Sequence, residues 1–208
     1  MGFETLMGFF ITSVLLALSP GPDNLFVMTH SLTHGKQAGV AVVLGLCTGL
    51  LVHTAIVALG IAAILQSSVW ALTVLKTVGA MYLLYLAWQA LTAETLALDQ
   101  FQAHRYRFLW SYRRGIIMNI TNPKVSLFFL AFLPQFLPAE SRSVTQEIVL
   151  LGSLFILATL LVFGAMAVMA GSLETLFRRS PAIQRRLNKL AAVVFVALAL
   201  HLLLASFV

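Results

Sequence analysis

Long apolar stretches separated by short polar connections dominate the chain, and this pattern predicts membrane-spanning helices. Six such spans can be drawn, at about residues 6–28, 39–65, 70–91, 115–137, 148–170 and 187–208. Each is long enough, at about 1.5 Å per residue of helix, to cross a hydrocarbon core about 30 Å thick. We therefore expect an all-α integral membrane protein whose single membrane domain occupies residues 1–208.

A polar stretch interrupts the first span and should break its helix: Ser19, Pro20, Gly21, Pro22, Asp23 and Asn24. Each of the two prolines lacks an amide hydrogen and clashes with the preceding turn, so the carbonyls of Leu16 and Leu18 should lose their helical partners. Irregular backbone and a carboxylate at membrane depth are tolerated only beside protein or a water-filled cavity. We expect this stretch to line a binding site. The plainer alternative is a proline kink with Asp23 reaching toward the lipid headgroups.

A second broken helix is predicted in the fourth span, where Asn119, Thr121, Asn122, Pro123 and Lys124 precede an apolar run. Pro123 should free the carbonyl of Asn119. The amides of Asn119 and Asn122 offer donors and acceptors to the backbone or to a polar solute. Lys124 lies deep in the span, where reaching the headgroups is difficult, so we expect its ammonium to face a site.

One face of the second span carries Gly45, Gly49 and His53 at a spacing of four residues. Small residues at this spacing allow helices to pack closely, which we favour for the glycines over a binding role. His53 is an ionisable ring on that packed face. It has two open interpretations, a structural partner or a role in handling substrate or protons.

The two breaks occupy matching places in the two halves of the chain, and this indicates a repeat. Repeat one would cover about residues 1–92 and repeat two about residues 113–208, joined by a basic connection at about 93–112. A unit of three spans must insert its second copy upside down. We therefore expect two inverted three-helix repeats with broken first helices, and paired breaks of this kind indicate a transporter site near the midplane.

The charge distribution predicts the orientation in the membrane. The formal net charge is +6, but the basic residues cluster between apolar spans, which indicates topology rather than nucleic-acid binding. Ten of the 13 Lys and Arg residues fall on one side: Lys36, Arg105, Arg107, Arg113, Arg114, Arg178, Arg179, Arg185, Arg186 and Lys189. By the positive-inside rule this side is cytoplasmic, so both termini should be periplasmic.

Composition excludes several classes of protein. With 60% hydrophobic and 10% charged residues, and a mean hydropathy of +0.96, the chain has too little polar surface for a soluble globule. Cys47 is the single cysteine, so a dithiol relay within this chain is excluded. The first span should stay attached, because Glu4 stands where a signal peptide carries positive charge.

The two breaks also carry a family resemblance. The chain resembles the LysE/RhtB superfamily of amino-acid exporters, in its homoserine/threonine-type branch, over its whole length. The residues that match are Ser19, Pro20, Gly21, Pro22, Asp23, Gly35, Gly79, Ala80, Tyr82, Leu83, Gly115, Asn119, Asn122, Pro123 and Lys124. The resemblance implies efflux of a small amino acid and leaves the solute open. Several members carry an acidic residue in the fifth span, where this chain has Leu157, Ala158 and Thr159.

The residues and the resemblance together predict a transporter of the bacterial inner membrane rather than an enzyme. A zwitterion needs both charges: Lys124 and the half-helices that begin after Pro22 and Pro123 suit its carboxylate, while Asp23 and freed carbonyls suit its ammonium. We expect no cofactor and no metal. The expected partners are the substrate, lipid and protons, and a homodimer is compatible with so short a chain.

The coupling ion and the rival functions rest on few residues. We expect proton antiport, with Asp23 as the proton carrier and His53 as the alternative. Efflux of a cation or metal is the alternative within the superfamily, but the spans offer it only Asp23, His53 and Cys47. A membrane subunit that only scaffolds a partner would not need Asp23 and Lys124 at membrane depth.

Overall fold

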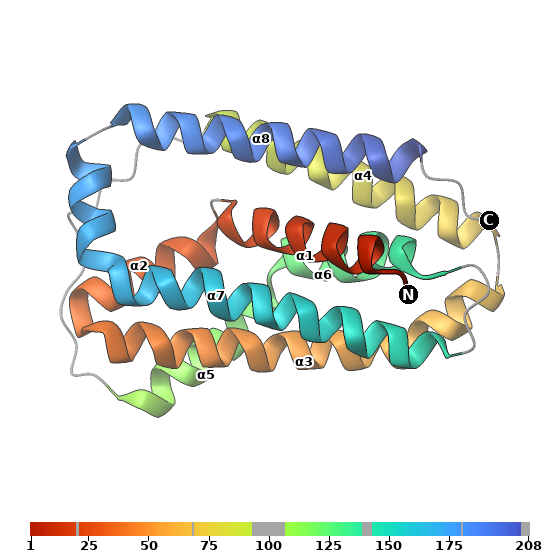
Figure 1. The fold of residues 1–208 in the computed structure, drawn as a ribbon, viewed down its shortest axis with the longest axis horizontal. Helices are drawn as coiled ribbons and strands as arrows, with labels where there is room; N and C mark the ends of the chain where they lie inside the picture. Colours follow the sequence, from red (N-terminus) through yellow and green to blue (C-terminus); the bar gives the residue numbers. More distant parts are fainter. Residues whose placement is uncertain (20, 68, 93–106, 139–142, 180, 205–208) are drawn as a thin grey trace.

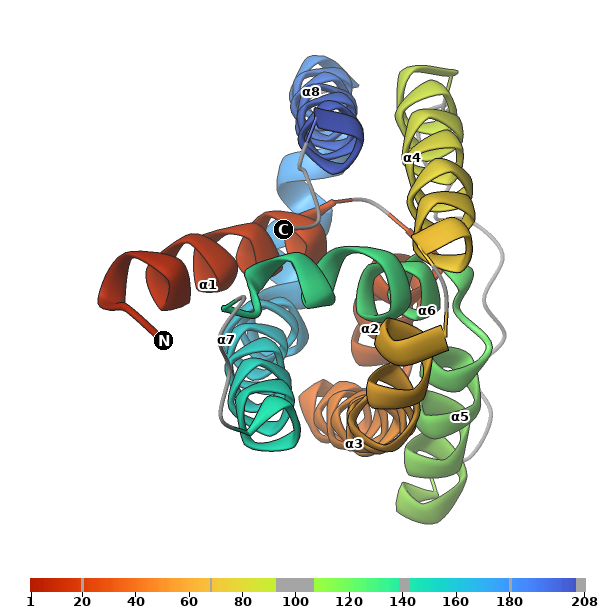
Figure 2. The same ribbon diagram turned by 90° about the vertical axis from the view of Figure 1, so that its right-hand side faces the viewer.

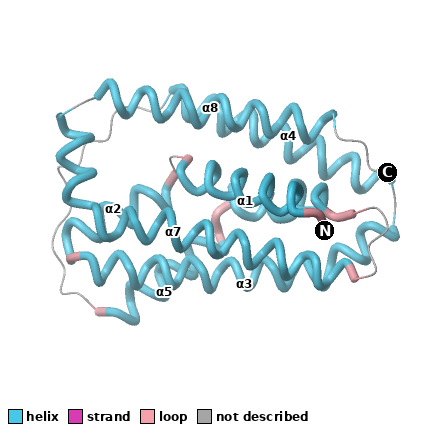
Figure 3. The backbone as a smooth tube through the Cα atoms, in the orientation of Figure 1, coloured by secondary structure: helices cyan, strands magenta, loops and turns pink. Residues whose placement is uncertain are grey.

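The computed structural model describes the chain except for residues 20, 68, 93–106, 139–142, 180 and 205–208, and it leaves some further side chains undescribed. All secondary structure in the described part is helical (Figure 3). The elements are α1 (Phe3–Leu18), α2 (Pro22–His34), α3 (Lys36–Ser67), α4 (Val69–Thr92), α5 (Phe108–Ile120), α6 (Pro123–Leu127), the π-helix η1 (Phe128–Phe132), the 3-10 helix η2 (Leu133–Phe136), α7 (Val144–Arg179) and α8 (Pro181–Leu204).

The chain runs along the long axis of the molecule and reverses direction repeatedly (Figure 1). α1 and α2 together lead from the end that carries the N-terminus to the opposite end, α3 returns, and α4 runs in the same sense along the long axis as α2. α5 then runs in the same sense along the long axis as α3, α7 in the same sense as α4, and α8 returns. Each segment of the second half therefore runs opposite to its counterpart in the first half.

Several helices have the length and composition of membrane spans. Three qualify alone, Lys36–Gly60, Val144–Ala170 and Arg185–Leu204. Two bent pairs qualify when each is taken as one span, α1 with α2, bent by 61°, and α5 with Pro123–Phe136, bent by 48°. These make up to five spans among the described residues. The third predicted span, 70–91, coincides with α4, which is not among the five.

The helices pack in three groups. α3 packs along α5 and α7, α4 packs along α8, and α1 and α2 both contact α7. In the end-on view, α1 and α6 lie between the α4–α8 pair and the group of α3, α5 and α7 (Figure 2). Aromatic side chains join these groups: the ring of Phe128 in η1 lies 5.8 Å from that of Phe9 in α1 and 5.1 Å from that of Phe155 in α7, measured between centroids.

The predicted packing face of α3 is confirmed. A Cβ atom at Gly45 would overlap the carbonyl of Tyr112, and one at Gly115 would overlap the carbonyl of Val42. A Cβ at Gly49 would stand 2.6 Å from the side chain of Asn119. The glycines therefore let α3 and α5 approach closely, as small residues do at interfaces between membrane helices.

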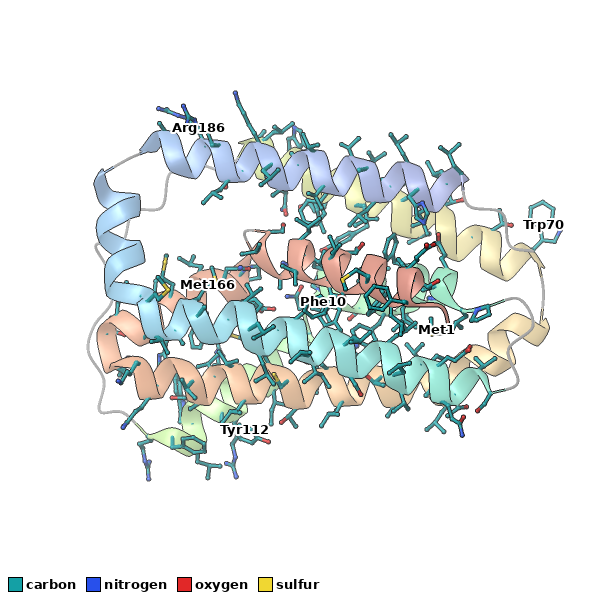
Figure 4. All side chains as sticks on the ribbon, in the orientation of Figure 1. Met1, Phe10, Trp70, Tyr112, Met166 and Arg186 are labelled. Atoms are coloured by element: carbon teal, nitrogen blue, oxygen red, sulfur yellow. The ribbon has the colours of Figure 1, made fainter. Side chains whose placement is uncertain are left out.

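The described basic residues at the starts of helices gather at one end of the molecule. Lys36 begins α3, Arg107 precedes α5, and Arg186 lies near the start of α8. All three helices begin at the same end, where Arg186 is labelled (Figures 1 and 4). Met1 and Trp70 lie at the opposite end, where α8 also finishes (Figure 4). The fold thus separates the basic end from the end that holds the N-terminus.

Candidate functional site

The first break lies between Leu18, where α1 ends, and Pro22, where α2 begins. Pro22 occupies the first turn of α2, where its missing amide hydrogen is not needed. The carbonyl of Leu16 does leave the helical pattern, as predicted, and it accepts a hydrogen bond of 3.3 Å from Lys124 Nζ. Lys124 Nζ also donates to the carbonyl of Ser19 at 3.2 Å. Pro20, part of the predicted site, lies outside the described residues.

A second side chain supports the first break from within α2. Asn24 Nδ2 donates to the carbonyl of Ala17 over 2.7 Å and lies 3.8 Å from Met166 Sδ. Asn24 therefore replaces part of the interrupted helical hydrogen bonding of α1. The sequence predicted Asn24 as part of the binding site, whereas in the structure its amide nitrogen bonds a backbone carbonyl.

The second break lies between Ile120, where α5 ends, and Pro123, where α6 begins. Asn122 caps α6: its Oδ1 accepts from the backbone N–H of Lys124 at 3.0 Å. The carbonyl of Asn119 accepts from His53 Nε2 at 3.2 Å and from the backbone N–H of Asn122 at 3.1 Å. Because a carbonyl only accepts, His53 carries its hydrogen on Nε2. Pro123 was predicted to free the carbonyl of Asn119, and this carbonyl accepts a bond from the side chain of another helix.

The two breaks are joined directly. Asn122 Nδ2 donates to Asp23 Oδ2 at 2.6 Å, and Lys124 reaches the carbonyls of the first break. Asp23 is 4% and Lys124 7% exposed, so both ionisable groups are buried. No ion pair joins these two described side chains, since Lys124 Nζ bonds carbonyls instead. Both side chains therefore remain available to pair with a charged solute.

A small cavity of about 20 Å³ lies at this junction. Its polar lining includes Asp23, Asn119, Lys124 and Thr159, and its apolar lining includes Phe155 and others. This volume has room for about one water molecule. The cavity as described is therefore too small for a solute as large as an amino acid.

Several buried oxygen atoms around the breaks have no hydrogen-bond partner. They are Ser19 Oγ, Asp23 Oδ1, Asn24 Oδ1 and Asn119 Oδ1. Buried polar atoms are normally paired, so each unpaired atom calls for water, an ion or a ligand. Both cavity-lining members, Asp23 and Asn119, contribute an oxygen that can accept a hydrogen bond from a bound solute.

The structure brings most of the predicted site residues together. Gly21 belongs to the same cluster, because a Cβ there would lie 3.2 Å from Lys124 Nζ. Pro22 and Pro123 begin the two half-helices. His53 is not part of the cavity lining. It bonds the carbonyl of Asn119, which does line the cavity, and its ring lies 5.6 Å from that of Phe129 between centroids.

The sequence did not predict the wall that α7 contributes. Phe155, Thr159 and Phe163 line the cavity from this helix. They follow one another at intervals of four residues and so share a face, which is the signal that could have found them. That signal is weak in a membrane helix, where apolar residues surround the whole circumference.

A second polar cluster, also missed from the sequence, joins α2 to α5. His30 Nε2 and Ser111 Oγ lie 2.8 Å apart, and the rings of His30 and His34 have centroids 4.4 Å apart. The ring of Phe26 stacks on His30 at 5.1 Å. No group of three or more His, Cys, Asp or Glu side chains positioned to hold a metal occurs among the described residues.

Comparison with known proteins gives a consistent result. The family model for the LysE type translocator matches residues 14–206. The homoserine/homoserine lactone efflux protein of Salmonella typhimurium is 33% identical over 195 residues, covering 91% of each chain. An uncharacterized membrane protein of Vibrio cholerae is 30% identical over 203 residues, covering 94% of each chain. One from Bacillus subtilis is 31% identical over 170 residues. No solved structure matches the protein with significance.

Proposed function

Because the chain belongs to the LysE family of translocators, we propose that it exports a small amino acid, or a close derivative of one, across the bacterial inner membrane. The homoserine/homoserine lactone efflux protein, similar over nearly the whole chain, supports a substrate of this size and chemistry. The candidate site supports it independently, because its groups suit a zwitterion.

The observation that carries the proposal is the meeting of two opposite charges at one buried cavity. Lys124 from the second break and Asp23 from the first both line it, and they form no ion pair with each other. The substrate carboxylate would replace the carbonyls of Leu16 and Ser19 as the partner of Lys124, since a hydrogen bond between two opposite charges is stronger than one from an ammonium to a neutral carbonyl. The substrate ammonium would donate to Asp23 Oδ1, which has no partner.

Inverted repeats provide the means for alternating access in this proposal. The segments of the second half run opposite to their counterparts in the first (Figure 1). Each broken span also packs against a helix of the other half. The span α1–α2 contacts α7, and the span α5–α6 packs along α3 through α5. Both breaks then lie at the interface between the repeats, where transporters of this architecture bind their substrates.

Proton antiport is proposed to run through Asp23. Its Oδ2 is held by Asn122, its Oδ1 has no partner, and the residue lines the cavity that the substrate would enter. A proton on Oδ1 and the substrate ammonium would then compete for one atom, which couples the two. His53 remains the alternative carrier.

The test uses the pure protein in liposomes. Labelled homoserine, threonine, leucine and lysine are loaded inside, and their efflux is followed with and without an inward proton gradient. Efflux of at least one amino acid, accelerated by the gradient, is the expected result. Efflux that does not depend on the gradient would overturn only the proposal of proton antiport. Absence of flux for the whole panel would overturn the proposal that the protein exports amino acids.

The proposed orientation has a separate test. We propose that the basic end faces the cytoplasm and both termini face the periplasm, as the separation of Lys36 and Arg186 from Met1 supports. Reporter fusions after Val208 should be active only with a periplasmic reporter. Activity of a cytoplasmic reporter at this position would invert the topology.

A further inference from the structure

One face of α7 forms a wall of the cavity that is apolar except for a single hydroxyl. Phe155, Thr159 and Phe163 are 4%, 2% and 5% exposed, and all three line the cavity. Leu46 of α3 adds to the apolar lining. Thr159 is thus the polar member of this wall, with a phenyl ring one turn away on each side.

The hydroxyl of Thr159 differs in its bonding from the other buried hydroxyls inside helices. Hydroxyls inside helices normally donate to the carbonyl four residues earlier. Ser13 does so at 2.7 Å, Ser31 at 2.7 Å and Thr54 at 2.8 Å. Thr159 has no hydrogen bond to any other residue that the structure describes, although it is more deeply buried than Ser31 or Thr54. The oxygen of Thr159 is not among the fully buried atoms without a partner in the described part of the chain, so it is open to the cavity that the residue lines, where water or a bound solute can supply the bond.

The charged groups enter the cavity from different helices than Thr159. Asp23 belongs to α2 and Lys124 to α6, whereas Thr159 belongs to α7. An amino acid held through its ammonium and carboxylate by the first two therefore has its side chain left for the wall of α7. The rings of Phe155 and Phe163 limit how far that side chain extends along the wall.

We propose that Thr159 determines specificity by exchanging a hydrogen bond with a hydroxyl on the substrate side chain, while the flanking phenyl rings keep that side chain short. The inference rests on the proposed function, because it assumes that a zwitterion occupies this cavity. It assigns to one residue the discrimination between a hydroxylated small amino acid, such as the one named for the Salmonella typhimurium relative, and an analogue of the same shape that lacks the hydroxyl. A site with a polar group aimed at a substrate hydroxyl penalises such analogues by leaving that group unpaired.

The experiment compares two competitors that differ by one hydroxyl. Homoserine and α-aminobutyrate are each titrated against the transport of a labelled amino acid in proteoliposomes. The wild-type protein, Thr159→Val and Thr159→Ser are measured side by side. Valine keeps the shape of the side chain without the hydroxyl, and serine keeps the hydroxyl, so serine is the matched control.

The expected result is a change in the ratio of the two inhibition constants. Wild type should favour homoserine, Thr159→Val should reduce the preference by about two- to tenfold, as loss of one neutral hydrogen bond predicts, and Thr159→Ser should retain it. An unchanged ratio in Thr159→Val, or no preference in wild type, would overturn the inference while export itself stands. If no amino acid is transported by wild type, the proposed function fails instead. Should Thr159→Val not insert, Thr159→Ala serves in its place.

Discussion

The two breaks differ in where their support comes from. The second break has its own cap, because Asn122 bonds the N–H of Lys124, and it takes one partner from the first half, because His53 of α3 holds the Asn119 carbonyl. The first break has one bond of its own, from Asn24 to the carbonyl of Ala17, and otherwise relies on the second break: Lys124 bonds the carbonyls of Leu16 and Ser19, and Asn122 holds the carboxylate of Asp23.

The difference indicates a direction of dependence between the two breaks. A change in the second break removes partners from the first, whereas a change in the first leaves the cap of the second intact. In the proposed mechanism a substrate takes Lys124 from its carbonyl partners, and the first break would then lose the support of that lysine. Substrate binding is therefore placed to loosen the first break rather than the second, and the variants below test this dependence.

Replacing Lys124 should have the largest effect. Lys124→Met removes the partner of the substrate carboxylate and of two carbonyls in the first break. Loss of a charged hydrogen bond costs about 3 kcal/mol, roughly a hundredfold in binding, so export should fall to background. The export rate is measured with labelled substrate in proteoliposomes. The variant should still insert into the membrane.

The matched control is Lys36→Met, which removes the same charge from an exposed position at the start of α3. This variant should export at the wild-type rate. Normal export by Lys124→Met would remove that lysine from the site and with it the proposed link between the breaks.

Replacing Asp23 should abolish coupling and spare exchange. Asp23→Asn keeps an oxygen that accepts from Asn122, so the contact between the breaks survives without a titrating group. Gradient-driven export should be lost. Exchange of labelled for unlabelled substrate should continue at a reduced rate, because exchange needs no net proton movement. A variant that still concentrates substrate when a proton gradient is imposed would end the coupling role of Asp23.

The positions of the breaks were predictable from the sequence, because proline acts locally on the backbone. Pro22 and Pro123 both begin half-helices, and the carbonyls expected to lose helical partners include those of Leu16 and Asn119, which do accept from other side chains. The burial of Lys124 also followed from its depth in the span. These features depend on few residues, each close in sequence to its effect.

The choice of partners was not predictable. Pairing Lys124 with the carbonyls of the first break, rather than with Asp23, depends on how two distant segments meet in space. The polar role of Thr159 was hidden for the same reason, because nothing in an apolar helix marks which face meets a cavity. The start of α5 at Phe108, inside the connection expected at 93–112, reflects the uncertainty of helix boundaries in sequence patterns.

Replacing Asn122 should lower the stability of the protein more than replacing Asn24, because Asn122 supports both breaks and Asn24 supports only the first. Asn122→Ala loses the cap of α6 and the bond to Asp23, which together are worth about 2 to 3 kcal/mol. Asn24→Ala loses the bond to the carbonyl of Ala17, worth about 1 kcal/mol. Thermal unfolding in detergent should therefore show a larger decrease for Asn122→Ala. An equal or larger decrease for Asn24→Ala would mean that the first break supports itself.

Replacing His53 should have the smallest effect and separates its two possible roles. His53→Gln keeps an N–H that can reach the Asn119 carbonyl but cannot titrate, so stability should stay within about 0.5 kcal/mol and proton-driven export should continue. His53→Leu removes the donor and should cost about 1 kcal/mol, because the carbonyl then retains only the N–H of Asn122. Thermal unfolding and gradient-driven flux are measured on both variants. If His53→Gln loses coupling while Asp23→Asn retains it, the proton travels through His53, and the second break, not the first, carries the coupling ion.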